Sequence, residues 1–175
     1  MKEYYVLNFL LNGKQLNALW FSDKENNDLL LSENNKILLF KSNTKIEENS
    51  IMINDSIQYT EFVYNFDKIN DENRWVRKAK KSYMDKEDFF EIDNIYILSL
   101  WNILKDVFTT IQIEFIGDDY KYDDIYNKIF FGNNCPSVTP KDKEYIPLWK
   151  IKEINSIKKV INEGIIVLNH NSIIK

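Results

Sequence analysis

The hydrophobic pattern of this chain changes period near residue 90, and no other feature constrains the fold as strongly. Before that point, apolar residues come in short runs separated by polar turns, over 4–11, 16–21, 29–31 and 37–40. After it, they recur at the spacing of one helix face. Short strands followed by helices are typical of the α+β class. We therefore expect an N-terminal antiparallel β-meander packed against C-terminal helices.

Two sequences in the first part of the chain predict tight hairpin turns. Asn12-Gly13 is a strong two-residue hairpin signal, and Asn34-Asn35 separates two further apolar runs. Residues 50–54 and 59–66 predict additional strands, the second of them from alternating side chains. We therefore expect about five or six strands within residues 3–66.

Three helices are predicted, over residues 93–111, 122–131 and 151–168. The first has Asp93 or Asn94 as its N-cap. It is nearly apolar between Ile95 and Leu104, so we expect burial around most of its circumference. The second helix ends at Gly132.

The length of 175 residues suffices for one hydrophobic core and is short for two ordinary domains. With no internal repeat and no Pro/Gly-rich linker, we expect a single domain over 1–175. Its parts are a β-rich half (1–66), an exposed charged connection with some helix (67–91) and a helical half (92–175). We expect no membrane span and no signal peptide, and the lone cysteine excludes an internal disulfide. The expected location is therefore the cytoplasm.

Few residues of this chain offer nucleophilic or general-base chemistry. The only histidine, His170, lies in an expected frayed tail, and the only cysteine, Cys135, lies in a loop without a base nearby in sequence. No calcium or phosphate loop is present. We therefore expect no catalytic residue, no metal, no cofactor and no enzymatic activity. A carboxylate-dependent enzyme stays open, because paired acids meet only in space.

An acidic run interleaved with tyrosines is the main candidate for a binding surface. Carboxylates attract a basic partner, and tyrosines supply contact area. The predicted partner-binding residues are Glu114, Asp118, Asp119, Tyr120, Tyr122, Asp123 and Asp124. The alternative is an ordinary solvated surface.

A basic run precedes the acidic one in the sequence. Its cations are Arg74, Arg77, Lys78, Lys80 and Lys81. Trp75 lies among these charges, and we expect it to be exposed, whereas Trp20, Trp101 and Trp149 are expected in the core. The run could contact phosphates of a nucleic acid, but a net charge of −4 and a pI of about 5.2 oppose that function. Another alternative is that the two runs pair with each other.

The chain resembles the immunity proteins of bacterial toxin systems, such as those of contact-dependent growth inhibition. The resemblance lies in its small size, acidity and aromatic content, and most of all in the segment from Trp101 through Asp118-Asp119-Tyr120 to Tyr145-Ile146-Pro147-Leu148-Trp149. It implies a non-catalytic inhibitor that binds and neutralises one cognate toxin, often a nuclease, by covering its active site. The implied partner is a cognate protein toxin, and the acidity of this chain favours a basic one. We expect no membrane and no nucleic-acid partner. The sequence leaves two alternatives open: a nucleic-acid-associated accessory protein and a carboxylate-dependent enzyme.

Overall fold

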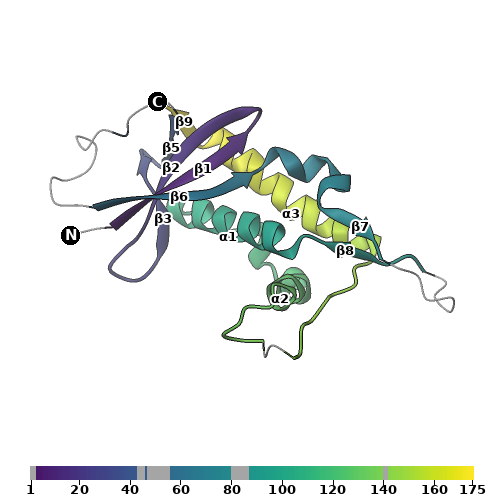
Figure 1. Ribbon diagram of the computed structural model, residues 1–175. Helices are drawn as coiled ribbons and strands as arrows, with labels where there is room; N and C mark the ends of the chain where they lie inside the picture. The colour runs from purple at the N-terminus through teal and green to yellow at the C-terminus, as the bar shows by residue number, and fades with distance from the viewer. Residues whose placement is uncertain (1–2, 43–45, 47–55, 80–86, 140–141) are drawn as a thin grey trace.

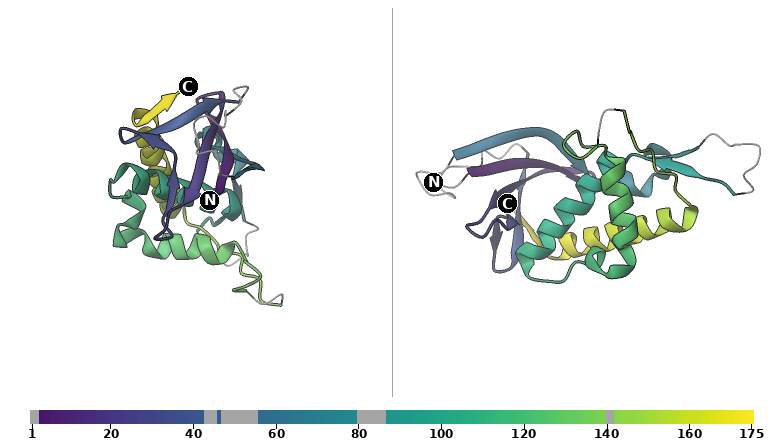
Figure 2. Two further views of the ribbon diagram at one scale, coloured as in Figure 1. Left: turned by 90° about the vertical axis from the view of Figure 1, so that its left-hand side faces the viewer. Right: turned by 90° about the horizontal axis from the view of Figure 1, so that it is seen from below.

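The computed structural model describes residues 3–42, 46, 56–79, 87–139 and 142–175. Helices α1 and α3 lie along one side of a seven-stranded sheet, and α2 packs on α1 (Figures 1 and 2). The N-terminal sheet and C-terminal helices confirm the predicted α+β class. The predicted strand at 50–54 lies outside the described residues.

The sheet contains both hairpins that the sequence predicts. Its strands are β1 (Glu3–Leu11), β2 (Lys14–Ser22), β3 (Asp28–Leu30), β4 (Ser32–Glu33), β5 (Lys36–Lys41), β6 (Ser56–Asn65) and β9 (Ser172–Ile174). Asn12 and Gly13 have φ angles of 52° and 71°, and Asn34 and Asn35 have 51° and 58°. Positive φ at both central residues is the type I′ geometry, whose twist matches that of the flanking strands.

The sheet is mixed, so the prediction of an antiparallel meander is wrong in this respect. Its order is β4-β5-β2-β1-β6, with β9 on β5. Strand β6 runs parallel to β1, and β9 runs parallel to β5. The alternation of side chains specifies which face a strand buries, but it specifies neither the neighbouring strand nor its direction.

Apolar side chains are buried on both faces of the sheet. Leu7, Phe9 and Leu11 of β1 belong to the main core, which includes α1 and α3. Tyr4 and Val6 point the other way, into a second cluster with residues of β2 and β5. The period of two along β1 thus supplies both clusters.

The three predicted helices are present as α1 (Asn94–Ile111), α2 (Asp123–Gly132) and α3 (Ile151–His170). The Asp93 Oδ1 accepts a hydrogen bond from the Tyr96 N–H at 3.1 Å, which caps α1 as predicted. Most residues of α1 are buried, because this helix packs against the sheet, α2 and α3.

The C-terminal residues are not the frayed tail that the sequence suggested. The N–H of Ile37 donates to the Asn171 carbonyl at 2.7 Å, and the N–H of Lys175 donates to the Leu39 carbonyl at 2.8 Å. The edge of β5 thus provides hydrogen-bond partners for β9. The two strands are far apart in the sequence, so local sequence patterns do not predict their pairing.

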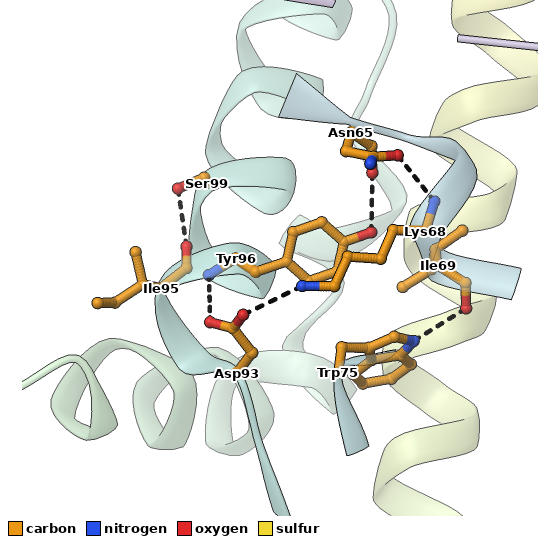
Figure 3. Close-up of polar contacts among 8 residues, drawn as sticks. All are labelled: Asn65, Lys68, Ile69, Trp75, Asp93, Ile95, Tyr96 and Ser99. Atoms are coloured by element: carbon orange, nitrogen blue, oxygen red, sulfur yellow. Dashed lines mark hydrogen bonds and ion pairs between the residues drawn. The ribbon is translucent and has the colours of Figure 1, made fainter. Parts of the chain in front are cut away.

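The charged connection contains two 3₁₀ turns and a small hairpin. Its elements are η2 (Asp67–Asn70), η3 (Glu72–Arg74), β7 (Val76–Lys78) and β8 (Phe90–Ile92). Trp75 is only 3% exposed, and its indole N–H donates to the Ile69 carbonyl at 3.0 Å (Figure 3). The expected exposure of Trp75 is therefore wrong. The charged residues near it in the sequence, Arg74 and Arg77, are exposed.

A polar junction ties the end of β6 to the start of α1 (Figure 3). The Tyr96 hydroxyl donates to the Asn65 carbonyl at 2.9 Å, and burial raises the pKa of this phenol. Lys68 Nζ lies 3.2 Å from the Asp93 carboxylate and 4.3 Å from the centre of the Tyr96 ring. Asp93 thus caps α1 and also forms an ion pair with Lys68 of the charged connection.

Candidate functional site: the α2 surface and the Asp106 cleft

The acidic run lies along two 3₁₀ turns, η4 (Ile116–Asp118) and η5 (Tyr120–Tyr122), that lead into α2. Gly117 is buried against the ring of Trp101, where an added Cβ would lie 2.8 Å from ring carbons. Tyr122 is 4% exposed, with its ring centre 6.4 Å from that of Trp101. Tyr122 therefore belongs to the core and is removed from the predicted docking residues. Tyr120 remains 86% exposed.

Some of the predicted carboxylates have local partners and others do not. Asp118 pairs with Lys105 at 2.9 Å, and Asp119 pairs with Lys121 at 2.6 Å. Glu114 and the two aspartates of the first turn of α2, Asp123 and Asp124, are exposed. Within the described parts of the chain, these three make no ion pair. The negative charge of these three side chains is therefore not neutralised by an ion pair.

A hollow of about 560 Å³ lies along α2 and is lined by one residue of the acidic run, Asp124. Phe131, Val138 and Tyr145 are each about half exposed on it, at 48%, 50% and 43%. We call the residues that line this hollow the α2 surface: Asp124, Asn127, Lys128, Phe131, Val138, Thr139 and Tyr145. The sequence prediction did not include the apolar residues of this surface. Residues 133–140 were predicted as a loop from their composition, and composition does not show which loop residues pack beside α2.

The one lysine of the α2 surface is engaged elsewhere. Lys128 Nζ lies 3.0 Å from the Glu153 carboxylate and 4.5 Å from the centre of the buried Trp149 ring. Both partners are at the start of α3 or just before it. Lys128 thus anchors α2 to the body of the protein, and its charge is balanced by Glu153 and not by Asp124.

The basic run makes ion pairs within its own hairpin. Arg77 Nε donates to Glu91 at 2.9 Å, and Lys78 pairs with Asp88 at 3.0 Å. Lys80 and Lys81 lie outside the described residues. With two cations paired and Trp75 buried, the described part of this run offers a smaller basic surface than its sequence suggests.

A second hollow, absent from the sequence prediction, lies between α1 and the sheet. This cleft of about 320 Å³ is lined by Tyr5, Leu7, Trp20, Thr60, Tyr64, Ser99, Asn102, Ile103 and Asp106. The Trp20 indole N–H donates to the Asp106 Oδ2 at 3.0 Å. The carboxyl is mostly buried, and burial raises its pKa to about 7, with a further contribution from Asp28. Burial and the charge of Asp106 also raise the pKa of Tyr64.

No family model, curated protein or solved structure matches this chain.

The remaining candidate groups have ordinary surroundings. The Cys135 Sγ lies 3.1 Å from the Ser137 Oγ, a contact that lowers the pKa of the thiol, and His170 Nδ1 lies 2.8 Å from the Ile166 carbonyl oxygen. Across the described ranges, no group of three or more His, Cys, Asp or Glu side chains could hold a metal ion. In the same residues, no helix has the length and apolar character of a membrane span.

Proposed function

We propose that this protein is a non-catalytic inhibitor of the immunity type, which binds and neutralises a basic protein toxin through the α2 surface and the acidic residues beside it. The observation that carries the proposal is the meeting of unpaired carboxylate and exposed aromatic side chains in one hollow. Asp124 lines it together with Phe131 and Tyr145.

These two kinds of side chain make different contributions to binding. Exposed carboxylates that make no ion pair attract a basic partner and accelerate encounter. Aromatic side chains bury a large area at a small cost in conformational entropy, and they are enriched in binding hot spots. An exposed apolar surface rimmed by charge is typical of a protein-binding site.

A carboxylate-dependent enzyme is the second candidate, and Asp106 is the observation that favours it. Its raised pKa suits a general acid or base near neutral pH. However, Asp106 is the one acid among the described residues that line its cleft. Hydrolysis by carboxylates commonly needs two such groups, so we rank this function below protein inhibition.

The proposed function is tested by finding the partner and measuring protection from it. A tagged copy of the chain is expressed in its native host, and the proteins that co-purify are identified. Each is then expressed in bacterial cells with and without this chain. We expect one partner that arrests growth alone and is neutralised in a stable complex. Co-purified proteins that are harmless, or a toxic one against which the chain gives no protection, would refute the proposal.

A matched pair of variants links protection to the α2 surface. Asp124→Lys changes a charge within the hollow, and Glu25→Lys makes the same change at an exposed residue of the β2–β3 loop. We expect reduced protection from the first and full protection from the second. Equal protection by both would place the interface elsewhere.

A further inference from the structure

Among the described residues, no cation forms an ion pair with the carboxylate of Asp106. Its hydrogen-bond donor is the neutral indole of Trp20 on β2, and it forms no ion pair among the residues that the structure describes. Lys105, next to it on α1, pairs instead with Asp118. Two charged groups act on the pKa of Asp106: Asp28 of β3, which has the same sign, raises it, and Lys105 lowers it by a smaller amount. A mostly buried, ionised carboxylate without a counter-charge is costly, and an incoming cation would lower that cost.

The walls around this carboxylate suit a cation. Tyr5, Trp20 and Tyr64 line the cleft. The ring centres of Tyr5 and Trp20 lie 5.5 Å apart, and their ring planes meet at 68°. The faces of such rings attract ammonium groups, because each ring is electron-rich above and below its plane. The same side chains form apolar walls that can accommodate an alkyl stem.

Polar oxygens in the cleft remain available as acceptors. The Thr60 hydroxyl donates to the Val6 carbonyl at 2.8 Å, and the Ser99 hydroxyl donates to the Ile95 carbonyl at 2.7 Å. Each hydroxyl oxygen keeps lone pairs for an ammonium group, which has three N–H donors.

A bulge in β6 lies at the cleft and contains Thr60. The β1–β6 pairing shifts from Val6↔Tyr59 to Asn8↔Val63, so β6 has extra residues over this stretch. The side-chain Nδ2 of Asn8 donates to the Thr60 carbonyl at 2.5 Å within the bulge. Such irregularities re-aim side chains and are frequent beside functional sites.

We infer that the Asp106 cleft binds an alkylammonium group, the chemistry that a lysine side chain shares with a small aliphatic amine. The carboxylate repels anions, and an uncharged guest would leave it uncompensated. A volume of about 320 Å³ is at the small end of ligand pockets and suits an alkyl chain with one charged end. This inference is independent of the proposed docking at the α2 surface.

The test follows the indole ¹H–¹⁵N resonance of Trp20 by NMR at pH 8, where the carboxyl is ionised. The probes are n-butylammonium, N-acetyl-lysine methylamide and, as the uncharged control, n-butanol. We expect a saturable shift with at least one cationic probe and none with n-butanol. Preference for the lysine derivative would indicate a peptide ligand, and preference for n-butylammonium a free amine. An equal response to n-butanol, or no response to either cation, would overturn the inference.

Three variants and a pH series show whether the Asp106 carboxylate is responsible for cation binding. Asp106→Asn keeps the shape of the side chain and should weaken binding at least tenfold, whereas Asp124→Asn removes the same charge from α2 and should leave it unchanged. Tyr64→Leu provides a second disruption of the cleft and should also weaken binding. Because protonation of Asp106 opposes cation binding, affinity should fall roughly tenfold from pH 8 to pH 6. Equal weakening by Asp106→Asn and Asp124→Asn would mean non-specific attraction and refute the site.

Discussion

Trp20 and Asp106 join the sheet to α1 through one hydrogen bond, from the indole N–H to Oδ2 at 3.0 Å. The bond holds a mostly buried carboxyl whose pKa is raised from 3.8 to about 7. The native state therefore binds this proton more tightly than the unfolded chain does. The stability from the protonated carboxyl is fully present below pH 3.8 and is lost as the pH rises towards 7.

Asp106→Asn should remove this dependence on pH. Between pH 5 and pH 8, the free energy of unfolding of the parent protein should fall by roughly 2–3 kcal/mol from this group, while the variant keeps that stability. Denaturant titrations at both pH values measure the difference. Parallel pH profiles for the two proteins would show that the buried carboxyl does not titrate in this range.

Gly117→Ala should destabilise the protein, because the new methyl group would overlap a ring carbon of Phe115 and lie 2.8 Å from the ring of Trp101. Overpacking of this kind costs about 1–3 kcal/mol. Thermal unfolding gives the loss, and near-ultraviolet circular dichroism reports the surroundings of Trp101. Phe115→Leu in the same chain should recover part of the cost if the two side chains collide.

Trp75→Phe should lower the free energy of unfolding by about 1–3 kcal/mol, because it removes the indole N–H that satisfies the Ile69 carbonyl. Chemical denaturation measures this loss. The nucleic-acid alternative makes a different prediction for this residue. Quenching of Trp75 fluorescence by added RNA in the folded protein would contradict its burial.

Asp124→Lys should slow association with the purified partner, more at low salt than at high salt. Stopped-flow mixing at two salt concentrations measures the rates. Because Asp124 lies in the first turn of α2, a lysine there also opposes the helix dipole by about 0.3–1 kcal/mol. Asp124→Asn separates this effect on the helix from the effect on encounter, and an unchanged rate for Asp124→Lys would mark the residue as solvated surface.

Phe131→Ser should accelerate dissociation from that partner, with a loss of about 2 kcal/mol or more if the ring is a hot spot. The ring is 48% exposed in the free protein, so its removal should change folding stability little. Surface plasmon resonance gives the dissociation rate, and thermal unfolding of the free variant is the control. A partner that dissociates at the original rate would place Phe131 outside the interface.

The sequence alone determined the local elements of this protein. Both hairpins turn where Asn12-Gly13 and Asn34-Asn35 predict them, since these residues tolerate the positive φ that the turns need. Helix α1 begins after Asp93 for an equally local reason, a side chain that accepts a backbone N–H of the first turn. Turn chemistry, capping and hydrophobic period act over a few residues, so a single sequence suffices to read them.

Only the tertiary structure decided which of these elements became neighbours. The direction of β6, the pairing of β9 with β5 and the burial of Trp75 were not predicted. The Asp106 cleft depends on residues from three strands and a helix, and Trp20 and Asp106 are 86 positions apart. Their meeting reflects the packing of the whole core, in which a helix covers the sheet and surrounds one carboxyl with apolar side chains. Local preferences carry no information about such a contact, because its free energy arises only when distant segments exclude water together.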